Sequence, residues 1–220
     1  ERRYKQSEVK AIKAQMNPHF VFNALNSIQD LIMLKDIRSS NEYLGKFANL
    51  MRKTLEASGK DHLELSEEIE LLRHYLELEK LRFGEEFQYQ LTCDIAEGET
   101  VDWAIPPLLL QPYVENAIKH GLLHKKGPKV LKVHFFLENG ALLCEIIDNG
   151  VGRKKSHEIN KRREGAHTSF ATSQNDKRIA LINESSDFDI SLVIQDLIEN
   201  DEVAGTRVRF SFSHSTVQIN

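Results

Sequence analysis

Apolar residues recur at helical spacing along the first part of the chain, and a proline interrupts this pattern. Steps of three and four residues separate Val9, Ile12, Met16 and Phe20. This spacing predicts that the four side chains form one face of an amphipathic helix. Pro18 lies within the run beside His19, and a proline inside a helix costs about 3 kcal/mol. Two interpretations are open: the backbone is shaped around a functional histidine, or the helix is kinked and the histidine is incidental.

A second amphipathic helix is expected after a polar break at residues 36–40. Its apolar face comprises Leu44, Phe47, Leu50, Met51 and Leu55. Two such helices joined by a short turn form an antiparallel hairpin, which cannot bury both apolar faces by itself. Two copies of the hairpin would bury these faces in a four-helix bundle, so the sequence predicts a homodimer.

The segment 57–61 contains a serine and a glycine and is the expected linker between two domains. It separates a dimerising helical hairpin at residues 1–59 from a second domain at residues 60–220. In the second domain, apolar runs predict strands at 62–65, 87–94, 129–137, 141–147, 190–197 and 203–212. The Asn139-Gly140 dipeptide between two of these runs is a strong hairpin signal.

Helices are expected between these strands. One runs from the N-cap Ser66 to about Arg82, one starts at 105–107 and ends at Gly121, and one covers 176–183. Residues 150–173 have little hydrophobic pattern and are expected to form a mobile loop. The chain is therefore of the α+β class, with a helical hairpin followed by a layer of antiparallel strands and helices.

Composition narrows the functional class. The chain has 220 residues and a formal net charge of −4, which argues against a nucleic-acid binder dominated by phosphate contacts. Cys93 and Cys144 lie in apolar runs without metal or redox spacing, which is consistent with a reducing compartment. No apolar run approaches the ~18 residues of a membrane span. Because the chain begins with Glu1, we expect it to be part of a longer protein.

The segment 111–121 is too polar for a helix that lies only in a core. It carries Glu115, Asn116, Lys119 and His120. A carboxylate and an amide oxygen are hard ligands that suit Mg²⁺, and a lysine one turn along the helix could reach a phosphate. The alternative is a solvated helix face, which this segment taken alone favours.

A second polar feature follows the strand predicted before residue 148. Asp148 could accept a hydrogen bond from an exocyclic amine such as that of adenine. Gly150 and Gly152 let the backbone turn sharply and approach a ligand closely. The same residue types also occur in plain turns, and the Gly205-Thr206 pair before the last strand carries little information alone.

The order and spacing of these four features resemble the sensor histidine kinases of two-component systems. Residues 15–26 read QMNPHFVFNALN, which is similar to the phosphoacceptor box QxNPHFxFNxLN of the LytS-type subgroup. Residues 106–121 are the second specific match. The sequences DNGVG at 148–152 and GT at 205–206 are shared more widely, with ATPases of the gyrase, Hsp90 and MutL superfamily. The resemblance covers essentially the whole chain.

This resemblance implies a role for each candidate residue. His19 would be the phosphorylated histidine, and Asn116 would bind Mg²⁺, with Glu115 beside it as a ligand or proton acceptor. Asp148 would bind the adenine amine of ATP. Further nucleotide contacts would come from Lys119, His120, Gly150, Gly152, Gly205 and Thr206. The implied fold is the dimerising hairpin followed by a Bergerat α/β sandwich, a mixed sheet backed by helices.

Two features depart from the family pattern. Many histidine kinases have an acidic residue directly after the phosphoacceptor, whereas this chain has Phe20. The base that takes the proton of His19 is therefore not identified, and Glu115 is a candidate. Residues 165–172 contain a single glycine where related enzymes carry a second glycine-rich box. Hydroxyls and a cation would then contact the phosphates, and the candidates are Thr168, Ser169, Asn175 and Arg178.

The resemblance thus implies the cytoplasmic part of a bacterial sensor histidine kinase, attached to the membrane only through a further N-terminal part. It would use Mg-ATP to phosphorylate His19 and pass the phosphoryl group to an aspartate of a response regulator, without direct contact to nucleic acid. Two alternatives are a non-catalytic dimeric signalling scaffold and an ATPase of the same superfamily. Phe20 and the glycine-poor stretch favour the scaffold.

Overall fold

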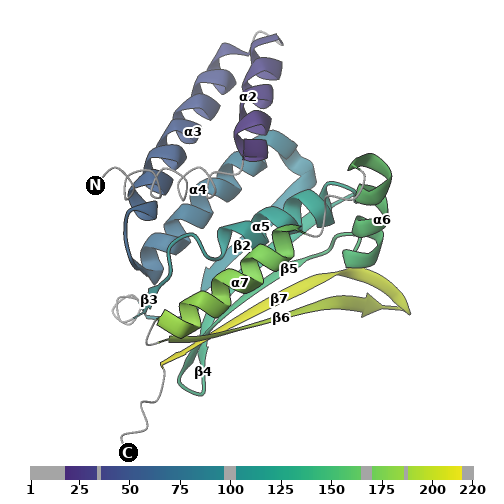
Figure 1. Cartoon of the computed structure of the whole chain (residues 1–220). Helices are drawn as coiled ribbons and strands as arrows, with labels where there is room; N and C mark the ends of the chain where they lie inside the picture. Colours follow the sequence, from purple (N-terminus) through teal and green to yellow (C-terminus); the bar gives the residue numbers. More distant parts are fainter. Residues whose placement is uncertain (1–17, 34–35, 97–102, 165–169, 186–187, 215–220) are drawn as a thin grey trace, which may run out of the picture. The chain divides into compact units, whose positions relative to one another are not determined.

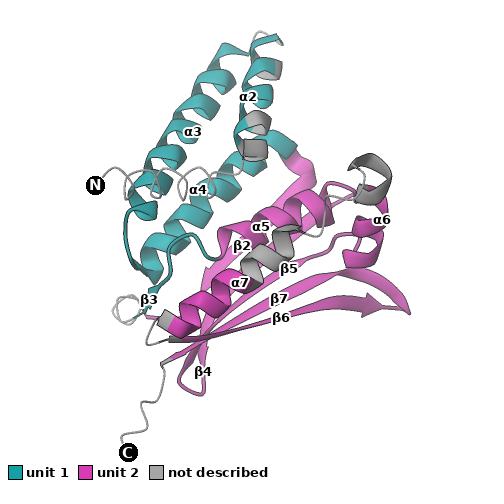
Figure 2. Ribbon diagram, in the orientation of Figure 1, with its two compact units in different colours: residues 1–84, 100–109 teal, residues 85–99, 110–220 magenta. Residues whose placement is uncertain are grey.

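The computed structural model describes residues 18–33, 36–96, 103–164, 170–185 and 188–214 (Figure 1). The chain divides into two compact units (Figure 2). The first comprises residues 1–84 and 100–109, and the second comprises residues 85–99 and 110–220. The functional boundary expected near residue 59 stays a prediction.

The first unit contains a helical hairpin, as expected. Helix α2 (Pro18–Met33) packs against α3 (Ile37–Ser58), and α3 packs against α4 (Leu65–Phe83). Strand β1 (Leu63–Glu64) pairs antiparallel with β3 (Ala104–Ile105). The helix expected before Pro18, and with it the predicted kink, lies outside the described residues.

Local chemistry determines where α3 begins and which face it buries. Asp36 is the N-cap, and its carboxylate accepts a hydrogen bond from the Ser39 backbone N–H at 3.0 Å. This bond lowers the pKa of the Asp36 carboxyl below its usual value. The buried face of the helix carries Tyr43, Leu50, Thr54 and Ala57. The helix ends at Ser58, with Gly59 as its C-cap, inside the predicted linker.

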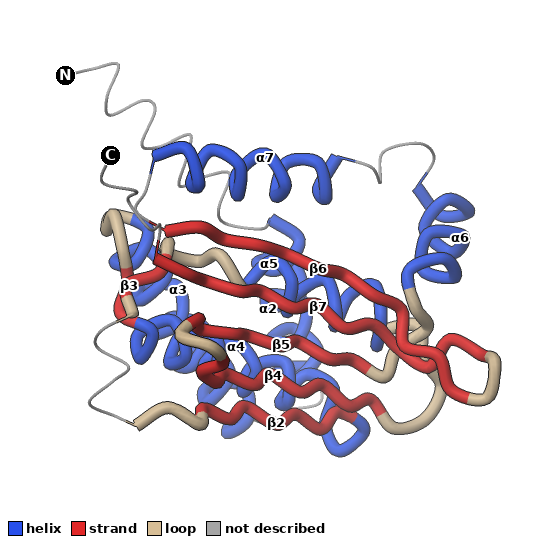
Figure 3. The backbone as a smooth tube through the Cα atoms, turned by 90° about the horizontal axis from the view of Figure 1, so that it is seen from below, coloured by secondary structure: helices blue, strands red, loops and turns tan. Residues whose placement is uncertain are grey.

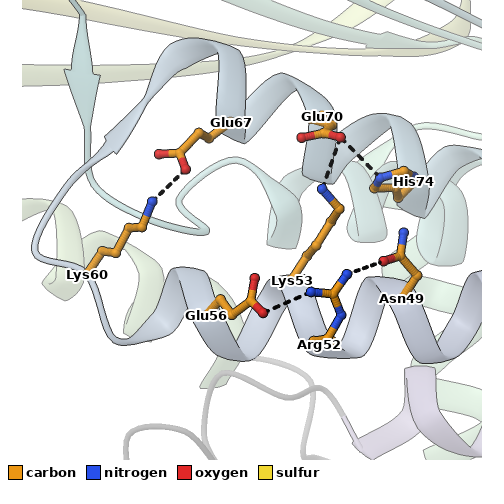
Figure 4. A network of polar contacts seen from close by, with 8 residues as sticks. All are labelled: Asn49, Arg52, Lys53, Glu56, Lys60, Glu67, Glu70 and His74. Carbon is orange, nitrogen blue, oxygen red and sulfur yellow. Dashed lines mark hydrogen bonds and ion pairs between the residues drawn. The ribbon is translucent and has the colours of Figure 1, made fainter.

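Ion pairs follow the boundary between α3 and α4. They are Lys46–Glu77, Lys53–Glu70 and Lys60–Glu67. Because the lysine numbers rise while the glutamate numbers fall, the two helices run antiparallel. Figure 4 shows that His74 also approaches Glu70, at 3.5 Å. Since exposed ion pairs each contribute about 0–1 kcal/mol, these pairs favour one alignment of the helices more than they stabilise the fold.

The start of α4 differs from the expectation. Glu64, not Ser66, is the N-cap, and the carboxylate of Glu67 accepts a hydrogen bond from the Glu64 backbone N–H at 3.3 Å. Glu67, three residues after the N-cap, therefore accepts the hydrogen bond of the N-cap backbone N–H, as the glutamate of a capping box does. Glu68, one residue later, is buried and accepts from the Leu108 backbone N–H at 3.0 Å.

Replacing Glu68 with alanine should lower the free energy of unfolding by about 1–3 kcal/mol, because it leaves a buried backbone donor without this acceptor. The conservative variant Glu68→Gln keeps an acceptor oxygen and should recover much of the loss. Denaturant unfolding of both variants measures the difference. Equal stability of Glu68→Ala and the unmodified chain would show that the bond is not stabilising.

The second unit contains a five-stranded sheet in the order β2-β4-β5-β7-β6 (Figure 3). Its strands are β2 (Phe87–Cys93), β4 (Lys129–Glu138), β5 (Ala141–Asp148), β6 (Phe188–Glu199) and β7 (Glu202–His214). A 3₁₀ turn, η1 (Gly84–Glu86), precedes β2. Strands β2 and β4 are parallel and the other neighbours are antiparallel, so the sheet is mixed. The α+β class and the strands predicted in this unit are confirmed, and the expected antiparallel pairing is wrong for the pair β2 and β4.

The predicted hairpin turn joins β4 to β5. Asn139 and Gly140 have φ angles of 52° and 78°, the pair of positive values that a type I′ turn requires. This turn sets a register that places Phe135 opposite Cys144, which lies opposite Phe210. All three side chains are fully buried. The Tyr113 ring packs edge-on against the Phe210 ring, at 4.8 Å between centroids, so that α5 (Gln111–Asn116) covers this core.

Two expected boundaries in the second unit are wrong. The helix expected to start at 105–107 begins at Gln111, because residues 104–105 form β3 and a turn follows. The segment expected to be a loop forms α6 (Arg153–Glu164), and α7 (Phe170–Ser185) also starts within it. The α6 segment consists mainly of arginine, lysine and glutamate, which are good helix formers and need no apolar face when exposed. No helix in the described part of the chain is long and apolar enough to cross a bilayer.

Candidate functional site

A buried carboxylate lies at the end of β5. The Asp148 side chain is 3% exposed, and the Gly150 backbone N–H donates to its Oδ1 at 2.8 Å. Burial raises the pKa of Asp148 to about 6, against the opposing effect of hydrogen bonds from the Gly150 and Thr206 backbones. A carboxylate held at this depth, with fixed orientation, is suited to accept a hydrogen bond from a ligand donor.

Glycines allow the backbone to close around Asp148. A Cβ atom at Gly121 would lie 2.6 Å from Asp148 Oδ1, and one at Gly150 would overlap the Gly121 backbone. A Cβ atom at Gly205 would overlap the Asp148 carbonyl oxygen. The Val151 backbone N–H donates to the Gly121 carbonyl at 3.2 Å. These contacts bring three parts of the second unit together around Asp148: the end of the polar helix, the turn after β5, and the part of β7 that pairs with Asp148.

The polar helix changes its winding where its charged residues lie. α5 ends at Asn116, and a π-helical segment, η3 (Ala117–Leu122), continues it and carries Lys119 and His120. Such wide turns frequently occur at functional sites. The η3 segment contacts β4, β5 and β7, which brings it to the strand that bears Asp148.

The predicted magnesium ligands are adjacent on α5. Glu115 and Asn116 are half-buried, and Glu115 Oε1 accepts a hydrogen bond from Gln111 Nε2 at 3.0 Å. Within the described ranges, no group of three or more His, Cys, Asp or Glu side chains is placed to hold a metal ion. Mg²⁺ is usually bound by one or two protein oxygens together with waters and substrate phosphates. Glu115 and Asn116 carry oxygens of the type that such a site uses, and their role as ligands stays a prediction.

Thr206 adds a second wall beside Asp148. It lies directly opposite Asp148 in the β5–β7 register and is 9% exposed. Gly205 precedes it with a φ of 153°, a conformation that side chains rarely adopt. The predicted group of Asp148, Gly150, Gly152, Gly205 and Thr206 therefore lies together in the second unit.

Other predicted residues are not placed at this group. His19 belongs to the first turn of α2 in the first unit, and its side chain is outside the described part. Thr168 and Ser169 also lie outside the described residues, as does the side chain of Asn175. Arg178 is half-buried on α7, which packs against β6. The roles of these residues at a phosphate stay predictions.

Sequence reasoning missed three residues of the site. Gly121 is expected only as a helix end, whereas its missing side chain lets η3 approach Asp148. Asp196 and Arg153 form an ion pair beside Gly152. A glycine directly after a polar helix is a signal that another part of the backbone packs closely against the helix end. The ion pair between Arg153 and Asp196 depends on the register of β6, which no local pattern reveals.

Comparison with known proteins points to one family. The family model described as histidine kinase matches residues 7–87. The chain is 32% identical over 148 residues to the sensor protein LytS of Staphylococcus haemolyticus, which covers 67% of this chain and 25% of that protein. The sensor protein LytS of Enterococcus faecalis is 34% identical over 148 residues, covering 67% and 24%. The chain thus spans about a quarter of the length of the curated relatives it matches.

A solved structure with similarity across most of the chain is the histidine kinase domain of the blue-light activated histidine kinase from Erythrobacter litoralis EL346. The TM-score is 0.49 and the sequence identity 11%, with 95% of this chain and 94% of that chain covered.

Proposed function

Because this chain belongs to the histidine kinase family and matches LytS sensor proteins over two thirds of its length, we propose that it binds Mg-ATP and phosphorylates its own His19. The observation that carries the proposal is the buried Asp148 carboxylate, which accepts a hydrogen bond from the Gly150 backbone and is closely approached by Gly121. The family match spans residue 19, which supports His19 as the nucleophile, and the buried carboxylate supports Asp148 as the adenine acceptor.

The adenine amine would donate to Asp148. The carboxylate is fixed by a backbone N–H and is buried, so its hydrogen bond to a ligand competes little with water. Gly150, Gly152, Gly205 and Thr206 would shape the same side of the nucleotide.

Affinity for the nucleotide should fall as the pH falls through about 6, because protonation removes the charge of the Asp148 acceptor. Calorimetric titration with ATP at pH 5 to 8 measures this. Adenosine, which has no phosphate to titrate, should show the same trend when it is titrated by NMR. An adenosine affinity that is constant over this range would contradict the assignment.

The phosphates and metal would lie toward α5 and η3. Asn116 would hold Mg²⁺, with Glu115 beside it as a further ligand or as the proton acceptor of the reaction. Lys119 and His120 would contact phosphate oxygens, and Thr168 and Arg178 would add a hydroxyl and a cation. A positively charged group near a triphosphate stabilises charge that spreads over the phosphoryl oxygens during transfer.

In the proposed reaction, an imidazole nitrogen of His19 attacks the γ-phosphorus. A nitrogen–phosphorus bond forms, the bond to the bridging oxygen of ADP breaks, and the imidazole proton passes to Glu115. The product is a phosphoramidate, which would donate its phosphoryl group to an aspartate of a response regulator. Catalysis of this kind depends mainly on positioning and charge stabilisation.

Exposed apolar side chains on the hairpin support a homodimer. Ile37, Leu44 and Leu55 lie on α3 and are 70%, 48% and 46% exposed. Their spacing of seven and eleven residues puts them on one face, which is separate from the buried face of the helix. Leu25 and Ile32 on α2 are 50% and 59% exposed. Two copies could bury these residues together.

We also propose that the chain is the cytoplasmic part of a membrane-anchored bacterial sensor.

Incubation with γ-labelled Mg-ATP separates the kinase from its alternatives. A histidine kinase would carry acid-labile label on the protein. An ATPase would release labelled phosphate with no protein label. A scaffold would do neither and would still dimerise. The proposal fails in the second and third cases.

A further inference from the structure

Three polar residues form a row across adjacent strands of the sheet in the second unit. Asp148 on β5 lies opposite Thr206 on β7, and Thr206 lies opposite Asp196 on β6. Directly opposed residues of neighbouring strands present their side chains on the same face. Asp196 is therefore on the Asp148 face, two strands away, and its side chain is 26% exposed.

Arg153 joins the far end of this row to the turn that follows β5. Its backbone N–H donates to Asp196 Oδ1 at 3.1 Å, its Nε donates to the same oxygen at 3.2 Å, and its Nη2 donates to Oδ2 at 3.3 Å. Arg153 is also the first residue of α6. One carboxylate thus accepts a free donor of the helix start and pairs with the guanidinium on two oxygens.

The segment between Asp148 and Arg153 is consequently fixed at several points. The Asn149 backbone N–H donates to the Val130 carbonyl at 3.1 Å, and the Val151 N–H donates to the Gly121 carbonyl at 3.2 Å. A Cβ atom at Gly152 would lie 3.7 Å from Asp196 Oδ1, so the segment ends directly on this carboxylate. The turn thus runs from Asp148 to the Asp196 carboxylate, which are the two ends of the row.

We propose that Asp196 is a positioning residue for the nucleotide, which acts by holding Arg153 and thereby the 149–152 turn against the adenine side of the site. This inference rests on the proposed function. Asp196 touches neither adenine nor phosphate in this account. Its loss would let the turn move away from Asp148 and would weaken nucleotide binding without changing the transfer step.

Charge gives the proposal a second consequence. The groups that act on Asp148 are the carboxylate of Asp196 from β6, Lys125 after η3, and the backbones of Gly150 and Thr206. Asp196 raises the pKa of Asp148. The positively charged guanidinium of Arg153 pairs with the Asp196 carboxylate at 3.2 Å. Neutralising Asp196 should therefore lower the pKa of Asp148, whereas neutralising Arg153 should raise it. A purely structural contact would not shift the two variants in opposite directions.

The test compares Asp196→Ala, Arg153→Ala and the double variant with Asp189→Ala, a control that removes another exposed carboxylate from β6. Each single variant should raise the KM for ATP and the dissociation constant about five- to tenfold, with kcat at saturating ATP within twofold. The double variant should bind no more weakly than the weaker single variant, because both changes remove one interaction. Asp189→Ala should behave like the unmodified chain.

The conservative variants give the charge readout. The pH midpoint of adenosine binding should fall in Asp196→Asn and rise in Arg153→Gln. Unchanged affinity in Asp196→Ala, additive losses in the double variant, or pH midpoints that move together would overturn the proposal. If the unmodified chain binds no nucleotide, the proposed function fails separately. Hydrogen exchange of backbone amides then tests whether Asp196 holds the turn, because Asp196→Ala must speed exchange at Val151 and Arg153.

Discussion

Replacing Asp148 with asparagine is expected to abolish ATP binding while making the folded chain more stable at neutral pH. The asparagine amide would direct an N–H₂ group toward either a backbone donor or the adenine amine, so one donor must face another. Stability should increase because a carboxyl with a pKa of about 6 when folded and 3.8 when unfolded opposes folding when it is ionised, by on the order of 3 kcal/mol.

The pH dependence of stability shows whether the gain in Asp148→Asn comes from removing the ionised carboxylate or from a change that does not depend on pH. The favourable contribution of protonated Asp148 is complete below pH 3.8 and is lost as the pH rises through about 6. Asp148→Asn should therefore unfold at higher denaturant concentration than the unmodified chain at pH 7.5, and this advantage should disappear toward pH 4. Asp189→Asn, an exposed change, is the control. Normal ATP affinity in Asp148→Asn would contradict the site assignment.

Replacing Gly205 with alanine should unfold or strongly destabilise the second unit, by roughly 3 kcal/mol or more. The new Cβ atom would overlap the Asp148 carbonyl oxygen and come within 3.0 Å of Asn149 Cα. Both are backbone atoms in the hydrogen-bonded end of β5, so relief requires separation of β5 from β7. Thermal unfolding followed by circular dichroism measures the change.

Gly140→Ala is the matched control for this prediction. Gly140 also has a positive φ, of 78°, but a Cβ atom there would meet nothing within 4 Å. Its cost should be limited to the backbone conformation, about 1–2 kcal/mol. Equal destabilisation by the two substitutions would show that the contact with Asp148 is not what requires glycine at 205.

Much of the fold follows from local patterns. Apolar patterns predicted β2, β4 and β5, and the Asn139-Gly140 pair predicted the turn between β4 and β5. Both signals act over a few residues, so they can be recognised in the sequence. Helix α6 was missed because it has no apolar face, and its residues are helical through propensity alone. The predicted N-cap of α4 was two residues too late. Glu64 and Glu67 form a capping box, in which each side chain accepts a hydrogen bond from the backbone N–H of the other, so no serine is needed there.

The site divides in the same way. The grouping of Asp148 with Gly150 and Gly152 was predictable because this motif is continuous in the chain, and the role of these residues at a nucleotide stays a prediction. The family that the sequence indicated is confirmed by the matched model and relatives. Gly121 and Asp196 act on Asp148 only through packing and sheet register, which join residues far apart in sequence. Their roles therefore become visible only in three dimensions.

The most direct test of the central claim is to locate the phosphoryl group. After incubation with Mg-ATP, mass spectrometry of peptides kept at alkaline pH should find one phosphorylated residue, His19. His19→Gln should carry no acid-labile label, whereas His62→Gln, a change at an exposed histidine directly after the predicted linker, should label normally. Undiminished label in His19→Gln, or a phosphoryl group on another residue, would contradict the account.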